Sequence, residues 1–189
     1  MPPLSRLLNV LAIACLGLAA PGAPALAASA DIRMTVCENA ICPWFKISAA
    51  PPPNWVEDSE YGDPRQMTVF GIPNQELPFI YVSASEVGAD SRLAKNVARN
   101  QSSWLAEHPD SRFRPLGATG QFSVYEVKNP SVPQQPYELM AFTQRTFTIR
   151  DRSYTLFIQA VLTGSDKAEV AGHLKDLKAF IKHFDDPAP

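Results

Sequence analysis

Two cysteines, Cys37 and Cys42, are the clearest candidates for side-chain chemistry, because only these two lie beyond residues 1–27. An isolated cysteine pair in an exported protein most often forms a disulfide. A redox couple has a two-residue spacer, and the spacer between these cysteines is longer. A redox couple and free thiols remain the alternatives to a disulfide. No histidine lies nearby in sequence to suggest a metal site. We therefore expect a structural disulfide that closes a short loop and contributes roughly 2 kcal/mol.

The three histidines, His108, His173 and His183, predict no metal or catalytic site. His173 and His183 fall on one expected helix, about 15 Å apart along its axis, so they cannot share a metal ion within one chain. His183 lies near the end of that helix, where a partial positive charge is favourable. His108 precedes Pro109, and the sequence identifies no carboxylate partner for it.

Motifs typical of enzymes are missing from the sequence. It contains no Gly-x-Ser-x-Gly, Ser-x-x-Lys or His-Glu-x-x-His motif and no phosphate-binding glycine loop. Asp110, Glu126 and Glu138 are scattered, and nothing selects two of them as an acid and a base. We expect no catalytic residue, no metal ligand and no cofactor. The alternative is a hydrolase or redox enzyme whose site is assembled from residues far apart in sequence.

Three arginines, Arg145, Arg150 and Arg152, crowd one expected hairpin and are candidate contacts for a ligand or partner. Arg145 interrupts the apolar alternation of Leu139, Phe147 and Ile149. It is therefore either an edge position that reaches solvent or a pocket cation that pairs with an anionic ligand or a partner carboxylate.

The N-terminus is typical of a secretory signal peptide. A weakly basic start precedes an apolar run over Leu7–Ala20, and Ala25-Leu26-Ala27 supplies a signal-peptidase site. The mature chain is expected to begin between Ala28 and Asp31 and to reside in the periplasm. Cys15 follows a small residue, as the cysteine of a lipoprotein signal does. A lipid-anchored protein is therefore an alternative, although a less favoured one.

Charge limits the class of partner. The only charged residue of the signal is Arg6, so the mature chain keeps all 19 acidic residues and one fewer than the 17 basic ones. This mildly acidic balance argues against nucleic acid, which requires a clustered basic surface. No later segment is apolar for the length that spans a bilayer. The expected partner is another envelope protein.

Hydrophobic periodicity predicts alternating strands and helices. A strand-like entry covers 34–47, followed by strands over 66–71, 79–84, 121–128, 137–149 and 153–162. Apolar residues occupy both faces of the strand over 153–162, which predicts a central strand covered on both sides. Asp90 or Ser91 is expected to cap a helix that ends at Glu107, and 109–120 reads as a polar connection. Asp166 and Glu169 form a capping box for a last helix with one apolar stripe, formed by Val170, Leu174, Leu177, Ile181 and Phe184.

This order predicts an α+β domain, with an antiparallel sheet of about six strands and two main helices packed on it. With Pro53-Asn54-Trp55 ahead of the strands, a middle helix and a long hairpin before the last helix, residues 46–184 resemble the PsbP-like group, which includes the DcrB-like exported proteins. Members often have Gly where this chain has Asn54. The resemblance implies a sheet sandwiched between helices and an accessory activity, such as binding a partner or assisting the assembly of a complex. No functional residue can be transferred from it.

The expected organisation is a signal peptide over 1–27, a disulfide-bearing segment over 28–45, a single α+β domain over 46–184 and a disordered tail over 185–189. The favoured function is that of an exported, non-catalytic accessory or binding protein that assists the assembly or stability of an envelope complex. The enzyme described above and a lipid-anchored structural protein of the envelope are the alternatives.

Overall fold

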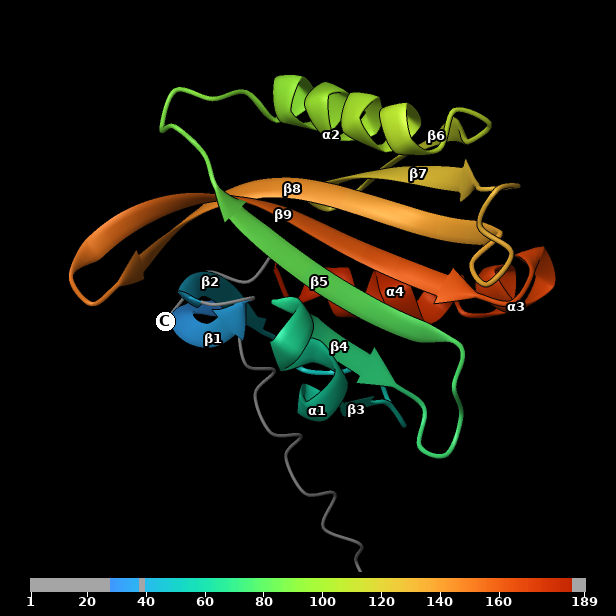
Figure 1. The fold of residues 1–189 in the computed structure, drawn as a ribbon, viewed down its shortest axis with the longest axis horizontal. Coiled ribbons are helices and arrows are strands. Elements are labelled where there is room, and N and C mark those ends of the chain that lie inside the picture. The colour runs from blue at the N-terminus through green and yellow to red at the C-terminus, as the bar shows by residue number, and fades with distance from the viewer. Residues whose placement is uncertain (1–27, 38–39, 185–189) are drawn as a thin grey trace, which may run out of the picture.

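The computed structural model describes residues 28–37 and 40–184, so the expected signal peptide and tail lie outside the described residues. Seven antiparallel strands form the main sheet in the order β3-β4-β5-β9-β8-β7-β6 (Figure 1). Their bounds are β3 Val56–Glu57, β4 Thr68–Gly71, β5 Phe79–Glu86, β6 Arg112–Thr119, β7 Phe122–Lys128, β8 Tyr137–Ile149 and β9 Arg152–Gly164. A separate hairpin consists of β1 (Ser29–Cys37) and β2 (Ala40–Ser48).

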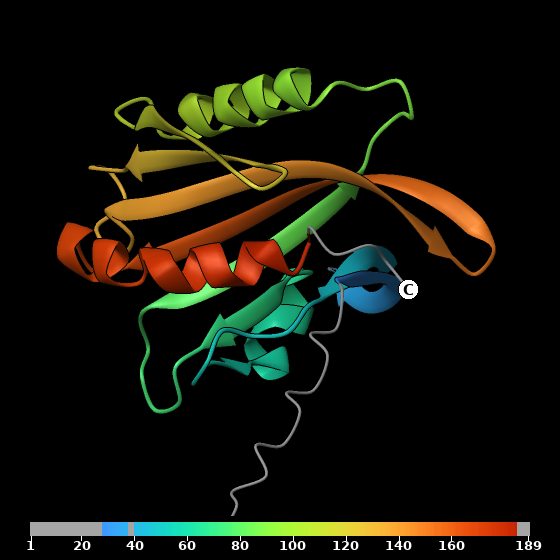
Figure 2. The same cartoon turned by 180° about the vertical axis from the view of Figure 1, so that it is seen from behind.

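Helices cover both faces of the main sheet. The bounds are α1 Ser59–Gly62, α2 Leu93–Glu107, α3 Lys167–Gly172 and α4 Leu174–Lys182, with a 3-10 turn, η1, over Asp63–Arg65. Figure 1 shows α4 behind β5 and β9, and the reverse view in Figure 2 shows it in front of them. Helix α2 packs on the other face. No helix among residues 28–37 and 40–184 has the length and apolar character needed to cross a membrane.

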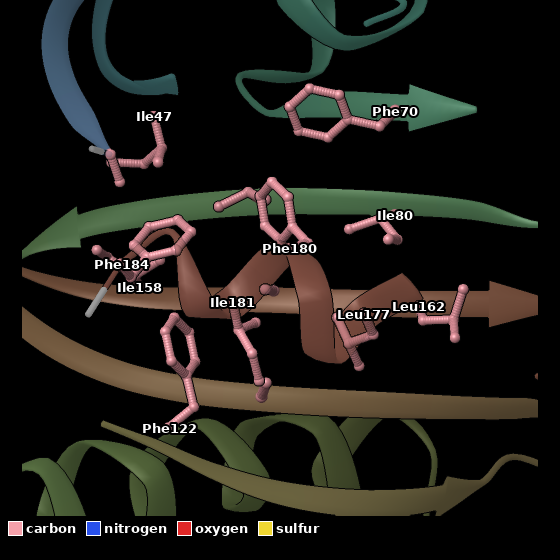
Figure 3. Close-up of a cluster of buried hydrophobic side chains, with 14 of the residues drawn as sticks. Ile47, Phe70, Ile80, Phe122, Ile158, Leu162, Leu177, Phe180, Ile181 and Phe184 are labelled. Carbon is pink, nitrogen blue, oxygen red and sulfur yellow. The ribbon is translucent and has the colours of Figure 1, made fainter. Parts of the chain in front are cut away.

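The α4 face holds the larger hydrophobic core, shown in Figure 3. Phe180 and Phe184 pack against the sheet, with ring centroids 5.2 Å from Phe70 and 5.2 Å from Phe122 respectively. Of the predicted stripe, Leu174 alone is partly exposed, and the rest is buried. Burial of each such side chain contributes about 1.5–3 kcal/mol, so this face anchors the fold.

The α2 face is smaller and more polar. Val97 is the one apolar residue of α2 that is fully buried. Amide pairs supplement it, with Asn96 Nδ2 donating to Gln144 Oε1 at 2.9 Å and Asn100 Nδ2 donating to Gln159 Oε1 at 3.0 Å. Helix α2 is therefore held as much by directional hydrogen bonds as by apolar contact.

Strand β9 confirms the predicted central position, since β5 and β8 flank it. Leu156 and Ile158 enter the α4-side core, whereas Phe157 and Val161 enter the α2-side core. A strand that is buried on both faces has apolar residues at successive positions.

The expected count of about six strands was wrong, because the main sheet has seven strands and the N-terminal hairpin adds two more. The segment read as a polar connection over 109–120 contains β6, an edge strand whose side chains are mostly exposed. An edge strand needs no apolar alternation and tolerates Pro115 next to a bulge. The strand-like entry over 34–47 is a hairpin, and the expected boundary between residues 45 and 46 falls inside β2.

Helix boundaries also differ from expectation in detail. Arg92 rather than Asp90 or Ser91 is the N-cap of α2, and its side chain makes no capping hydrogen bond. Asp166 caps α3 as predicted, accepting from the Ala168 and Glu169 amides. The expected last helix is interrupted at His173, which separates α3 from α4.

Candidate functional site

The β1–β2 hairpin divides into a packed base and an exposed end. At its base, Ile32 and Phe45 are cross-strand partners that pack against the main core, where the Phe45 ring lies 5.4 Å from that of Tyr154. At its end, Val36 is paired with Ile41 and Met34 with Pro43. We call residues 33–36 and 40–43 the distal arm. Directly opposed residues share one face of a ribbon, so four apolar side chains lie together there.

The apolar side chains of the distal arm are far more exposed than a core would allow. Val36 is 75% exposed, Ile41 69% and Met34 62%, the highest values among the large hydrophobic residues described as exposed. Contiguous exposed apolar surface usually marks an interaction site, whereas isolated exposed hydrophobic residues are ordinary.

Lys46 fixes the base of this arm to the body. Its Nζ lies 2.7 Å from Glu57 Oε1 and 3.1 Å from Asp63 Oδ1, and the residue is buried. Burial lowers the pKa of Lys46, but the two carboxylates outweigh it and leave the pKa above its usual value. The β1–β2 hairpin is thus tied to β3 and η1.

The register of β1 and β2 brings the two cysteines close along the arm. Cys37 is paired with Ala40, and Cys42 with Thr35, so the cysteines stand two positions out of register on adjacent strands. The side chain of Cys37 lies outside the described residues, and the disulfide stays a prediction.

A second candidate surface, which is concave, lies beside β3, β4 and β5. Val56, Gly71 and Phe79 are direct neighbours across these strands and share one face. Gly71 has no side chain, so a hollow opens between the flanking residues. A cleft of about 530 Å³ lies on the Phe79 side, and an adjoining hollow of about 470 Å³ lies on the Val56 side. We call the two together the Gly71 trough.

The arginines predicted as contacts are found in different situations. Arg145 is half-buried, and its Nη1 donates to the carbonyl of Phe184 just beyond α4. The sequence did not predict this contact with a backbone carbonyl. Arg150 and Asp151 form the tight turn of the β8–β9 hairpin, with φ of 48° and 65°, and Arg152 is exposed at the start of β9.

His173 and His108 have different neighbours in the fold. His173 Nδ1 lies 2.7 Å from Asp176 Oδ2, and its ring meets Trp55 edge-on. The His108 ring packs 4.7 Å from Trp104. Within the described ranges, no group of three or more His, Cys, Asp or Glu residues is placed to hold a metal ion.

A buried carboxyl group lies on the α2 face, where sequence reasoning singled out no site. Glu138 has no exposed surface, and its Oε2 accepts from Asn129 Nδ2 at 2.8 Å. Its Oε1 and the hydroxyl of the cross-strand neighbour Thr163 have no hydrogen-bond partner among the described residues. Burial raises the pKa of Glu138 to about 7, against the opposing effect of the Asn129 hydrogen bond. Burial, with a smaller contribution from Glu138, also raises the pKa of Tyr81 well above its usual value.

Asn129 links this carboxyl group to α2. Its Oδ1 accepts from Ser111 Oγ at 2.9 Å and from Trp104 Nε1 at 3.2 Å. Glu138 could be recognised in the sequence only as a charged residue just before the apolar run of residues 139–142. Its burial depends on β7 and β9, which flank β8.

Comparison with known proteins gives no family for this chain. No protein-family model, no curated protein and no solved structure matches it.

Proposed function

We propose that this chain is an exported, non-catalytic accessory or binding protein that contacts another envelope protein through its distal arm. The observation that supports this proposal is the exposure of Val36, Ile41 and Met34 on one face of the ribbon. A partner with an apolar surface would remove these side chains from water, gaining about 25 cal/mol for each Å² of apolar surface buried.

The construction of the arm fits a contact element. An isolated two-stranded ribbon is marginally stable in water, so an arm that must present a defined face needs a brace. The predicted Cys37–Cys42 disulfide would supply one near its end, while Lys46 anchors its base. A stiff arm loses less conformational entropy on binding than a flexible one.

The accessory role agrees with the resemblance to the PsbP-like group, which we also keep as a proposal. In that interpretation, the seven-stranded sheet with helices on both faces is the common scaffold. The β1–β2 hairpin is then an addition that gives this chain its own partner.

A photo-crosslinking amino acid at position 36 or 41 of the chain expressed in a bacterial periplasm tests the proposal. We expect an adduct with a different exported protein, which mass spectrometry identifies. The matched control is position 116 on β6, because Leu116 is also an exposed hydrophobic residue, at 42%. No adduct, an adduct only between two copies of this chain, or equal adducts from position 116 would contradict the proposal.

Binding to the purified partner then measures the contribution of the apolar face. The double substitution Val36→Thr and Ile41→Thr keeps β-branched side chains on the arm but adds hydroxyl groups. We expect the Kd to rise about tenfold or more. Leu116→Thr should leave the Kd unchanged.

A further inference from the structure

The Gly71 trough is hollow because Gly71 has no side chain. Gly71 lies between Val56 and Phe79 in directly paired strands, and a Cβ atom built on it would meet nothing within 4 Å. Glycine weakens a strand because it packs no side chain, and it often marks a place where a ligand or another backbone approaches closely. Helix α1 borders the same trough. It can pack closely against the start of β4 because Gly62 has no Cβ atom, which would otherwise clash with the Met67 carbonyl oxygen.

The trough lining combines an apolar floor with acidic and amide walls. Val69, Leu77 and Phe79 form the apolar part of the cleft, and the ring of Tyr61 lies 6.0 Å from that of Phe79. Two acidic residues, Asp58 and Glu76, and three glutamines, Gln75, Gln134 and Gln135, also line the cleft.

The charges on the trough have one sign. Glu57 and Glu60 line the adjoining hollow, and no Lys, Arg or His is among the described residues that line either part. Two cations lie close by: Lys46 pairs with Glu57, and Arg65 stacks on the ring of Tyr61 at 3.8 Å. Asp58 caps α1 by accepting from the Tyr61 amide. Glu60 and Glu76 have no ion pair within the described part of the chain, so the trough favours a positively charged occupant.

The form of the trough favours a chain segment over a small molecule. Its two parts share Asp58, Gly71 and Gln75 and are both open to solvent, so they make one elongated surface rather than an enclosed cavity. Backbone can pass close over Gly71, and the glutamine side chains can donate to and accept from peptide groups.

We propose that the Gly71 trough binds an extended segment of a partner protein that presents a lysine or arginine side chain to the carboxylates of Asp58 and Glu76. The aliphatic stem of that side chain lies on the apolar floor, and its charged end meets the acidic wall. This site involves different residues from the distal arm, so either can be correct without the other.

Fluorescence anisotropy with short labelled peptides tests this site on the purified chain. A Lys-Ser repeat peptide should bind, with an affinity that falls as salt is added, and a Glu-Ser repeat should not. Gly71→Phe fills the trough without meeting a neighbouring atom at Cβ, and should weaken binding about tenfold or more. Glu76→Lys should weaken it about as much, whereas Glu107→Lys, an exposed change on α2, should have only a small effect.

Three results would overturn the proposal. The first is equal binding of the Lys-Ser and Glu-Ser peptides. The second is that Gly71→Phe and Glu76→Lys both leave the affinity for the Lys-Ser peptide unchanged. If the Gly71→Phe chain does not fold, the result for Glu76→Lys decides. The third is binding of lysine amide as tight as that of the peptide, which would show a site for a free cation and not for an extended segment.

Discussion

Glu138 shows how a single residue can make stability depend on pH. In the folded chain its pKa is about 7, and its ordinary value is 4.5. Below pH 4.5 both the folded and the unfolded states are protonated at this group. Between these two values the unfolded chain releases a proton that the folded chain keeps, so rising pH favours unfolding.

We expect the free energy of unfolding to fall by about 3 kcal/mol through Glu138 as the pH rises from 4 to 8. Urea unfolding at several pH values measures this change. Glu138→Gln removes the titrating group and should flatten the profile, while Glu107→Gln on the exposed side of α2 should keep it. A Glu138→Gln chain that retains the full pH dependence would show that another group is responsible.

Arg145 contributes to stability through a hydrogen bond to the backbone of Phe184. Because its guanidinium donates to the carbonyl of Phe184, it joins the residues just after α4 to β8. Arg145→Ala should therefore lower the free energy of unfolding by about 1.5–2 kcal/mol, the lower part of the range for a hydrogen bond from a charged group.

Arg152→Ala, at an exposed position on β9, is the control for Arg145→Ala and should change stability by less than about 0.5 kcal/mol. Thermal and urea unfolding measure both variants. If Arg145→Ala keeps full stability and instead weakens binding of an anion or an acidic partner, its role is that of a ligand contact.

At the scale of elements, the β1–β2 hairpin is the part of the fold that most needs a covalent brace. Every residue of its distal arm is exposed or half-buried. Neither β1 nor β2 pairs with a third strand among the described residues. Such a ribbon has little apolar burial to hold it together.

The mass of the oxidised chain should be lower than that of the reduced chain by two hydrogen atoms, with Cys37 and Cys42 joined in one peptide after digestion. Replacing both cysteines by Ser should cost roughly 2 kcal/mol or less, because the closed loop is short. The loss should be confined to the arm, as faster amide exchange over 33–43. A complete loss of folding would mean that the pair supports more than the hairpin.

At the scale of the whole molecule, the two faces of the sheet are held in different ways. Helix α4 buries Leu177, Phe180 and Ile181 completely, whereas α2 buries only Asn96 and Val97. Helix α2 depends on amide pairs and on the Trp104–Asn129 hydrogen bond, each worth about 1 kcal/mol net.

We therefore expect α2 to open before α4 in the native state. Hydrogen–deuterium exchange should show faster amide exchange over 93–107 than over 174–182, because local opening follows the amount of buried apolar contact. Asn96→Ala and Asn100→Ala should speed exchange in α2 and leave α4 unchanged. Equal protection of both helices would contradict this picture of the two faces.

Local periodicity was enough to predict much of the architecture. Three features follow from residues that are close together in sequence and whose spacing matches the period of a strand or helix. They are the bounds of β8, the burial of β9 on both faces and the apolar stripe of α4. The same reasoning failed for β6, because an exposed edge strand has no apolar alternation to read.

The candidate sites were decided by the tertiary structure. The trough exists because β3, β4 and β5 align Gly71 between Val56 and Phe79, and their register cannot be read from any one segment. The burial of Glu138 and the contact between Arg145 and Phe184 likewise join segments far apart in the chain. Strands, helices and the cysteine pair could be assigned from the sequence alone, because these depend on neighbours along the chain. Only packing across the sheet decided which polar residues are buried and which apolar ones are left exposed, since burial depends on residues distant in sequence.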